Sequence, residues 1–509
     1  MSVSKVYSAQ TNLLQVQIIE VETDLSRGLY AFNLVGLPDK AVEEAKDRVG
    51  AAIKNSGLTS PKQKNQKIVI SLAPANEKKE GASFDLAIAL SYLLASEEVE
   101  FDSKHKLFLG ELALDGALRP VRGILPITKF AAAHNFKEIY VPKGNAKEAA
   151  LIEGINVYGA ETLSELLKHL SGEKLITKTP KTAFAKVQRE SSTDFSDVRG
   201  QERAKRGLLI AAAGGHNVAM YGPPGTGKTM LAKAFAGILP ELSFDEALEA
   251  TSIYSVAGVL SGFITEPPFR APHHTASYVS LVGGGATPRP GEITLAHRGV
   301  LFMDEFPEFE RRVIESLRQP LEEKYISVAR AKGTAKFPAD LLLIAAMNPC
   351  PCGNFGFRGK PCICSPGALQ RYRRKMSGPI IDRIDLWLEV DRVLPHDLSD
   401  EGPVGAKSDV YKKLVSNARN VQAERFKNLN GKLTKNSEMS ARDLVTLVPL
   451  KPDVRQTLNL AAERLGMSPR VYHRMLKVAR TIADLDNSTD ITRDHMLEAV
   501  EYRPKKFDV

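Results

Sequence analysis

The chain has 509 residues, of which 43% are hydrophobic and 25% charged, and this length suits about three domains of ordinary size. No apolar run reaches the ~18 residues that a membrane span needs, and the first residues lack the apolar core of a signal peptide. We therefore expect a cytoplasmic protein without a membrane partner. The formal net charge of +9 favours an anionic partner only weakly.

Residues 1–170 alternate short segments of strand and helix character. The apolar segments 14–21 and 67–72 predict strands, whereas 40–56 and 84–95 have the composition and period of helices. This pattern predicts an α+β domain.

Three motifs of this first domain resemble the proteolytic domain of Lon proteases: residues 79–83 (KEGAS), 108–112 (FLGEL) and 118–123 (LRPVRG). Ser83 falls where that family has its nucleophile. The family's general-base lysine belongs just after Gly123, where this chain has Ile-Leu-Pro, and Lys129 lies several residues further on. Because a serine without its base is a poor nucleophile, we interpret the domain as degenerate and Ser83 as a helix N-cap.

Residues 171–198 are polar, rich in Lys, Thr and Ser, and without periodicity, which predicts a linker.

A second predicted domain follows at residues 199–395. Its apolar segment 218–221 predicts a buried strand and 230–236 a helix. Between them the sequence fits G-x-x-x-x-G-K-[ST], the phosphate-binding loop of nucleotide hydrolases. The loop consists of Gly222, Pro223, Pro224, Gly225, Thr226, Gly227, Lys228 and Thr229.

This loop predicts ATP and Mg²⁺ as cofactors. Its glycines let backbone N–H groups turn toward phosphate oxygens, and the following helix adds positive charge at its N-terminus. Lys228 is expected to reach the β- and γ-phosphates, and the Thr229 hydroxyl to ligate Mg²⁺.

Later strands supply further candidate catalytic groups. Asp304 and Glu305 end the apolar segment 299–303, where Asp304 is expected to hold the Mg²⁺ shell and Glu305 to polarise the attacking water. The segment 341–347 delivers Asn348 to the carboxyl end of a strand, where open α/β sheets bind ligands. Asn348 therefore suits a residue that orients water or senses the γ-phosphate.

Arg383 precedes a strand predicted at 385–390 and is a candidate arginine finger. Such a residue acts in trans and implies a ring of subunits with active sites at the interfaces. A surface salt bridge is the alternative role.

Together these residues resemble an AAA+ ATPase. Residues 269–277 (FRAPHHTAS), 282–285 (VGGG) and 290–297 (PGEITLAH) are similar to the magnesium-chelatase-like branch. With the Lon-like domain before them and a cysteine cluster after them, the chain resembles the ComM/YifB family of competence proteins. The resemblance implies a homo-hexamer that acts on single-stranded and branched DNA. It also implies ATP-driven branch migration during recombination of incoming strands, with recombination proteins as partners.

We expect His273 and His274 to lie in an ordered loop and not to form a metal site.

All four cysteines lie within the segment 350–364, namely Cys350, Cys352, Cys362 and Cys364. Disulfides are disfavoured in the cytoplasm, and four thiolates suit a tetrahedral structural Zn²⁺. The two C-x-C pairs are tighter than the usual C-x₂₋₄-C spacing.

Two basic segments are candidate DNA contacts. Residues 325–330 and 334–337 predict a hairpin with a basic tip that includes Arg330, Lys332 and Lys336. After the cysteines, Arg371, Arg373 and Arg374 are expected to contact single strands, together with aromatic residues nearby. A solvated surface explains both segments as an alternative.

Residues 396–509 predict a helical lid, with helices at 409–429, 440–447, 451–465, 469–483 and 492–502. Ser468 is expected to cap the fourth helix, with Pro469 at its first position. This helix resembles the one that carries a second sensor in AAA+ proteins. Arg470 is therefore the candidate for a γ-phosphate contact within the same subunit, with Arg474 and Arg480 as alternatives.

The expected fold class is α/β. It combines a P-loop module (parallel sheet with flanking helices), a helical lid and a preceding α+β domain. The expected function is an ATP-dependent hexameric DNA motor. Three alternatives stay open at this point: a magnesium-chelatase motor subunit that acts on a protein partner, an ATP-dependent protease, and a nucleotide-gated scaffold.

Overall fold

The structure is a computed structural model that describes residues 3–12, 15–182, 193–260, 262–285, 289–330, 333–357, 360–393, 405–427, 429 and 433–503. Contacts divide the chain into two compact units. The first comprises Met1–Lys186 and Leu248–Phe263, and the second comprises Val187–Ala247 and Ile264–Val509. The helix α9 (Phe244–Ala257) belongs to the first unit from Leu248 onward.

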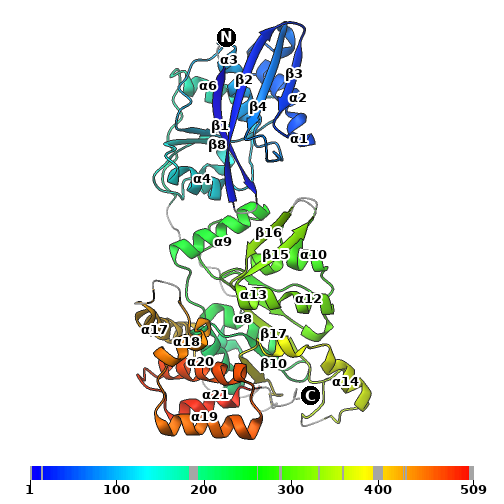
Figure 1. The fold of residues 1–509 in the computed structure, drawn as a ribbon, viewed down its shortest axis with the longest axis vertical. Coiled ribbons are helices and arrows are strands. Elements are labelled where there is room, and N and C mark those ends of the chain that lie inside the picture. The colour runs from blue at the N-terminus through cyan, green and yellow to red at the C-terminus, as the bar shows by residue number, and fades with distance from the viewer. Residues whose placement is uncertain are drawn as a thin grey trace. The chain divides into compact units, whose positions relative to one another are not determined.

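The first unit contains a mixed seven-stranded sheet in the order β3-β4-β2-β1-β5-β8-β9 (Figure 1). β2 pairs antiparallel with β1 and β4, and the other neighbours are parallel. The strands are β1 Ser4–Asn12, β2 Gln15–Arg27, β3 Ala31–Val35, β4 Gln66–Ala73, β5 Lys106–Phe108, β8 Glu138–Pro142 and β9 Asn156–Ala160, with a short ribbon of β6 Glu111–Leu112 and β7 Leu118–Arg119. The strands predicted at 14–21 and 67–72 are confirmed as β2 and β4.

The helices of this unit are α1 Lys40–Glu43, α2 Ala45–Asn55, α3 Asp85–Ala95, α4 Ile124–Ala133, α5 Lys143–Ala149 and α6 Leu163–Leu170, with a 3₁₀ turn at Pro61–Gln63. The single helix predicted at 40–56 is interrupted at Glu44. The predicted N-cap role of Ser83 is wrong, because α3 begins at Asp85 with Phe84 at the N-cap position. The turn before α3 brings the buried carboxylate of Asp85 to Arg48, whose Nε lies 2.7 Å away.

The second unit is built on a five-stranded sheet in the order β11-β14-β17-β10-β18, in which all neighbours are parallel. Figure 1 labels its central strands β17 and β10. The strands are β10 Val218–Tyr221, β11 Phe269–Arg270, β14 Val300–Met303, β17 Leu342–Met347 and β18 Leu386–Glu389. Two antiparallel ribbons accompany the sheet, β12 Gly283–Gly284 with β13 Arg289–Pro290 and β15 Tyr325–Arg330 with β16 Gly333–Pro338. The predicted strands and the predicted hairpin are confirmed.

The helices next to this sheet are α7 Glu202–Gly214, α8 Lys228–Ile238, α10 Tyr278–Val282, α11 Glu292–Leu295, α12 Arg311–Ser316, α13 Arg318–Glu323, α14 Pro366–Arg374 and α15 Gly378–Ile381. The C-terminal helices are α17 Ser408–Phe426, α18 Ala441–Leu447, α19 Pro452–Leu465, α20 Pro469–Leu485 and α21 Arg493–Glu501. Short 3₁₀ turns lie at Phe195–Asp197, Phe306–Glu308 and Asn436–Glu438. All five predicted lid helices are confirmed, and Ser468 caps α20 as expected by accepting a hydrogen bond from the Val471 N–H.

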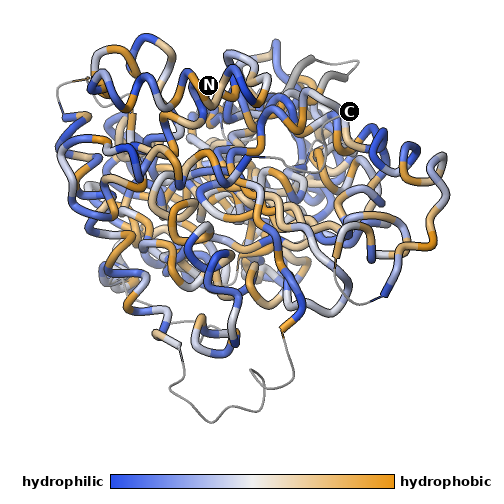
Figure 2. The backbone as a smooth tube through the Cα atoms, turned by 90° about the horizontal axis from the view of Figure 1, so that it is seen from below, coloured by the Kyte–Doolittle hydropathy of each residue, from blue (hydrophilic) through white to orange (hydrophobic). Residues whose placement is uncertain are grey.

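One continuous hydrophobic core joins the sheet of the second unit to α7, α8 and the C-terminal helices α17, α20 and α21. Every residue of β10, β14 and β17 is buried, as expected for parallel strands covered on both faces. Figure 2 shows the hydrophobic stretches gathered toward the interior, whereas the outer turns are mostly hydrophilic. The sheet therefore provides a rigid platform, and the loops at its carboxyl edge are where a ligand is expected.

Candidate active site

The phosphate loop leaves the central strand β10 and enters α8. At its start, the Gly222 N–H donates to the carbonyl oxygen of Met347 on β17 at 3.2 Å. A Cβ atom on Gly222 would lie 1.9 Å from the carbonyl oxygen of Val390, so only glycine fits between β17 and the end of β18. Gly225 (φ +77) and Gly227 (φ +88) adopt the left-handed conformation that glycine tolerates best. The local chain thus has the backbone that a phosphate cradle requires.

Lys228 is buried at the first position of α8, with 8% of its surface exposed. Its Nζ donates to the carbonyl oxygens of Gly222 at 2.9 Å and Pro223 at 2.8 Å, and lies 3.4 Å from Asn348 Oδ1. Burial lowers the pKa of Lys228, which the nearby charge of Asp304 partly opposes. The structure therefore brings together the predicted lysine and the predicted sensor asparagine, which come from neighbouring strands.

The predicted magnesium ligands also meet. The Thr229 hydroxyl donates to Asp304 Oδ2 at 2.8 Å, and Asp304 Oδ1 accepts the backbone N–H of Glu305 at 2.9 Å. A hydroxyl and a carboxylate beside a phosphate loop are the oxygen ligands that Mg²⁺ takes in nucleotide hydrolases. These residues fit a Mg²⁺–ATP complex held by Asp304 and Thr229.

His274 is a site residue that the sequence did not reveal. Its Nδ1 lies 3.0 Å from the Glu305 carboxylate, and its ring contacts that of His273, with centroids 4.3 Å apart and the planes tilted by 31°. Glu305 itself adopts a left-handed backbone (φ 52) and its side chain is 53% exposed. Its position depends on β11, which precedes His274 in the chain and pairs with β14, the strand that Asp304 follows. The expectation of an ordered loop was too general, because this loop touches the candidate general base.

Arg383 lies at the opposite edge of the same sheet. It precedes β18, which runs parallel to β10 with Leu386 paired to Val218, so about 13 Å of strand separates this edge from the phosphate loop. Its guanidinium is ion-paired with Glu322 of α13, and the side chain is 12% exposed. The salt bridge considered as the alternative is therefore present. A contact in trans requires a second subunit and stays a prediction.

Arg470 is exposed on the first turn of α20. This helix crosses the same edge as Arg383: Thr481 bonds to His216, which precedes β10, and Arg474 bonds to the carbonyl oxygen of Ile384, which precedes β18. Arg470 lies one turn before Arg474 on this helix, and its contact with a γ-phosphate stays a prediction. The alternatives, Arg474 and Arg480, are both buried, and Arg480 is ion-paired with Asp484.

The four cysteines form one cluster. Sγ of Cys350 lies 3.3 Å from that of Cys352 and 3.8 Å from that of Cys362, and all four sulfurs lie within 4.8 Å of one another. A tetrahedral site with Zn–S bonds of about 2.3 Å has sulfurs roughly 3.8 Å apart, so the four side chains fit a structural metal ion. Hydrogen bonds from the backbone of Asn354 and Ile363 lower the pKa of Cys352 to about 6, whereas burial and the neighbouring sulfurs raise the pKa of Cys362 and Cys364.

The cluster is joined directly to the nucleotide site. Gly353 approaches the ring of Pro224 in the phosphate loop so closely that a Cβ would lie 2.5 Å from it. The Tyr372 hydroxyl of α14 donates to the carbonyl oxygen of Asn348 at 3.0 Å. These two contacts connect the sensor asparagine and the phosphate loop with the cysteine cluster and the basic helix α14.

The candidate DNA contacts are only partly placed. Arg371 and Arg374 are exposed on α14, and the Arg373 guanidinium lies 5.3 Å from the ring centroid of Phe355. Lys336 is exposed on β16, 4.8 Å from the ring of Tyr325. Lys332 and the side chain of Arg330 lie outside the described residues.

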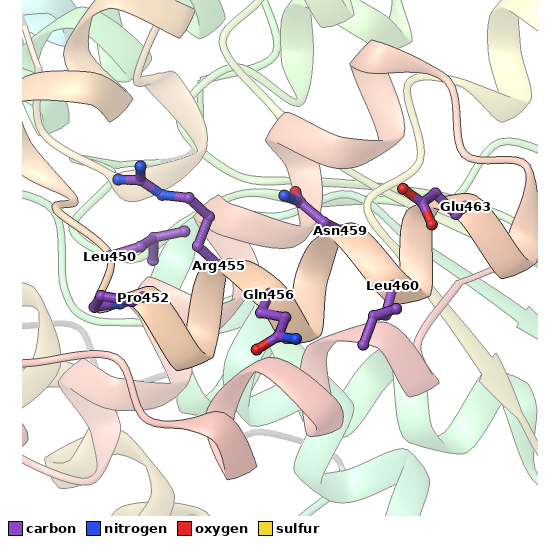
Figure 3. A pocket seen from close by; sticks show the side chains of 7 residues that line it. All are labelled: Leu450, Pro452, Arg455, Gln456, Asn459, Leu460 and Glu463. Carbon is purple, nitrogen blue, oxygen red and sulfur yellow. The ribbon is translucent and has the colours of Figure 1, made fainter.

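A shallow surface pocket of about 410 Å³ lies along one side of α19 (Figure 3). It is lined by Leu450, Pro452, Arg455, Gln456, Asn459, Leu460 and Glu463. It shares no residue with the phosphate loop or the acidic pair, so we assign it no part in nucleotide chemistry.

The fold and the site define a class. A parallel sheet in this order, a phosphate loop on its central strand, an acidic pair and an asparagine on the neighbouring strands, and C-terminal helices define an AAA+ ATPase module. In the described part of the chain, no helix combines the length and apolar character needed to cross a membrane.

Comparisons with known proteins give the family. Residues 194–398 match the family model "Magnesium chelatase, subunit ChlI", 405–503 match its C-terminal model, and 21–145 match "Subunit ChlI of Mg-chelatase". The chain is 42% identical to the competence protein ComM of Haemophilus influenzae, covering 99% of this chain and 98% of that protein. It is 43% identical to the protein YifB of Escherichia coli over 99% of this chain and 97% of that protein. A more distant similarity, 21% identity over 67% of this chain and 40% of the relative, links it to the DNA replication licensing factor mcm-6 of Caenorhabditis briggsae. The chain belongs to the ComM/YifB family of magnesium-chelatase-like AAA+ proteins, as its motifs predicted.

Proposed function

We propose that this protein is a hexameric motor that couples ATP hydrolysis to branch migration of DNA during recombination of incoming single strands. The observation that carries the proposal is the convergence of Lys228, Thr229, Asp304 and Asn348 at the carboxyl ends of three neighbouring parallel strands. This is the constellation that ATP hydrolysis requires.

Each group has a distinct part in the proposed chemistry. The Lys228 ammonium would neutralise charge on the β- and γ-phosphates of bound ATP, and Asp304 and Thr229 would hold a magnesium ion that supplies further positive charge there. Glu305 accepts the proton of the attacking water as general base. Asn348 orients this water or the terminal phosphate. His274 lies 3.0 Å from the general base and belongs to the same constellation.

The placement of the arginines supports a ring. Arg383 precedes β18, and Arg470 lies one turn before Arg474, which bonds to the carbonyl oxygen of Ile384, so both positions favour service at a neighbouring site. In a closed ring of identical subunits, one surface of a subunit meets a different surface of the next, so a residue remote from its own site can reach a neighbouring one. We therefore assign Arg383 as a finger for the neighbouring site, and Arg470 as a second contact there instead of in its own subunit.

DNA as the substrate rests on the names of relatives and on exposed basic residues. ComM is named as a competence protein, and mcm-6 as a DNA replication licensing factor. Arg371 and Arg374 on α14 and Lys336 on the hairpin suit contacts with phosphates, and Arg373 beside Phe355 suits contact with unstacked bases. Arg330 and Lys332 at the hairpin tip are assigned the same role. Tyr372 ties α14 to Asn348, which gives the nucleotide state a route to the DNA contacts.

We assign the cysteines a structural Zn²⁺ that holds the segment between Asn348 and α14 against the phosphate loop. We assign the first unit as a degenerate Lon-like domain without protease activity. Leu125, which occupies the region where the catalytic lysine of such a domain is expected, is fully buried in an apolar cluster with Leu151 and Leu248. Lys129 is exposed on α4.

The test is ATPase and strand-exchange activity of the full-length chain on a three-stranded DNA junction. We expect DNA to stimulate ATP turnover, and we expect strand exchange at the junction only with hydrolysable ATP. Lys228→Ala abolishes both activities. Lys233→Ala, an exposed lysine on the same helix, is the matched control and leaves both unchanged. ATP hydrolysis that DNA does not stimulate supports the second candidate, a chelatase-type motor, which the three family-model matches favour. Failure to hydrolyse ATP at all would refute both.

A further inference from the structure

We propose that Arg474 is a positioning residue that fastens the loop of Arg383 to the lid helix α20. Movement of the lid in one subunit then changes the position of Arg383, which this subunit directs at the active site of its neighbour. This inference rests on the proposed function of Arg383 as a finger in trans.

The carbonyl oxygens of three consecutive residues, 382–384, accept hydrogen bonds from side chains. Arg474 Nη1 donates to the carbonyl oxygen of Ile384 at 2.6 Å, and Arg474 Nη2 donates to that of Asp382. Between them, Asn217 Nδ2 donates to the carbonyl oxygen of Arg383 itself at 3.1 Å. The backbone of the candidate finger is thus clamped from two sides, by the lid helix and by the residue that precedes β10.

The clamp is buried and charged. Arg474 is 5% exposed, and its Nε lies 3.4 Å from the carboxylate of Asp385, the residue that begins the approach to β18. Asp385 also accepts the Asn217 N–H at 2.9 Å. A planar guanidinium that bonds two carbonyl groups and a carboxylate fixes orientation as well as distance, which a lysine cannot do.

A second contact joins the same helix to the same edge of the sheet. Two turns after Arg474, the Thr481 hydroxyl lies 2.9 Å from Nε2 of the fully buried His216. The His216 ring in turn lies 3.7 Å from Asp385. Because α20 is held at two points along its length, a shift of the helix is transmitted to the Arg383 loop and is not absorbed by a flexible side chain.

The same helix carries Arg470 on its exposed first turn, one turn before Arg474. If Arg470 contacts the neighbouring nucleotide as proposed, Arg470 and Arg383 both reach that nucleotide and move together with α20. Arg474 supplies the link between them and touches neither nucleotide.

The first experiment measures ATPase kinetics of full-length Arg474→Lys. We expect kcat to fall about 10²-fold, the loss that a misplacement of roughly 1 Å causes, with KM for ATP within about twofold of wild type. Arg480→Lys is the matched control. Arg480 is equally buried on the same helix but is bound to Asp484 and to the carbonyl oxygen of Thr489, away from the Arg383 loop. We expect it to lower the unfolding temperature without changing kcat.

The second experiment uses mixed rings and separates positioning from folding. Subunits with Lys228→Ala lack an active site but carry the finger, whereas subunits with Arg383→Ala retain the site and lack the finger. Mixing the two restores ATPase activity if Arg383 acts in trans. We expect Arg474→Lys to abolish this rescue when placed on the Lys228→Ala subunit and to leave it intact when placed on the Arg383→Ala subunit.

Each outcome is decisive. Equal loss of rescue from either subunit makes Arg474 a structural residue and overturns the inference, as does unaltered rescue from both. Failure of the parent mixture to regain any activity, with each subunit folded, refutes the finger in trans and the inference with it. If Arg474→Lys does not fold, Arg474→Gln, which keeps one amide donor for one carbonyl, is tested in the same mixtures with the same expectations.

Discussion

Replacement of Gly222 by alanine tests the geometry of the phosphate loop directly. The new Cβ would lie 1.9 Å from the carbonyl oxygen of Val390 and 3.0 Å from its carbonyl carbon. A carbon and a carbonyl oxygen approach no closer than about 3.3 Å in ordinary contacts, so the start of the loop and the end of β18 must separate by roughly 1.4 Å. Both partners are backbone, so no side-chain rotation relieves the overlap.

The expected loss of stability follows from two parts. Overpacking of this kind costs about 1–3 kcal/mol. The separation also weakens the adjacent hydrogen bond from the Val390 N–H to the carbonyl oxygen of Tyr221, now 2.9 Å long, which contributes about 1 kcal/mol. A total of about 2–4 kcal/mol lowers the unfolding temperature of a module of this size by roughly 4–16 °C. Displacement of the loop also weakens ATP binding at least about tenfold, equivalent to ~1.4 kcal/mol.

The assay combines thermal unfolding of the full-length chain with titration of a fluorescent ATP analogue. Gly367→Ala is the control, because Gly367 lies on α14 with nothing within 4 Å of its added Cβ. This control should change stability by no more than about 1 kcal/mol. If Gly222→Ala unfolds at the wild-type temperature and binds the analogue with wild-type affinity, the close approach of β18 to the loop is wrong.

Three further predictions concern the rest of the site. Glu305→Gln should retain ATP binding and lower kcat by about 10²–10⁴-fold, which is the usual contribution of a general base. Single-turnover hydrolysis measures this change, and undiminished turnover would mean that another residue is the base. Cys352→Ser should lose the metal that we propose at the cysteines, measured by atomic emission. It should also weaken ATP affinity, because Gly353 beside the cluster packs on Pro224 of the phosphate loop. A variant without metal but with normal affinity contradicts this link. Arg374→Glu should reduce the slope of log affinity for single-stranded DNA against log salt by about one. Lys375→Glu, whose native ammonium is ion-paired with Glu308 at 2.7 Å, should reduce it less, and equal slopes would remove α14 from the interface.

The phosphate loop could be predicted from the sequence because its chemistry is local. Gly222 to Thr229 are consecutive, and the strand and helix that flank them have clear periods. Asp304 and Asn348 were also predictable, since each directly follows an apolar strand. All strands of this sheet run parallel, so residues that follow their strands meet at one edge.

The contact between His274 and Glu305 was beyond sequence reasoning. The two residues are far apart in the chain, and β11, which positions the first of them, consists of only Phe269–Arg270. Such a short strand has no detectable alternation, so nothing in the local pattern shows that it joins the sheet beside β14. The prediction of Ser83 as the N-cap of α3 was wrong for a related reason. The burial of Asp85 against Arg48 is a tertiary contact, and it fixes where that helix begins.

The arginines of α20 show most clearly why periodicity alone cannot assign roles. Arg470 and Arg474 are one helical turn apart, a spacing that puts both on similar faces and made them interchangeable candidates for a sensor. The structure separates them: Arg470 is exposed, whereas Arg474 is buried against the carbonyl groups that flank Arg383. What distinguishes them is where α20 passes the start of β18, and that depends on the packing of the whole lid against α7. The same geometry has a functional consequence. Residues that follow the parallel strands meet at the carboxyl edge of the sheet, whereas Arg383 precedes its strand, and our proposal that Arg383 serves another subunit depends on this difference.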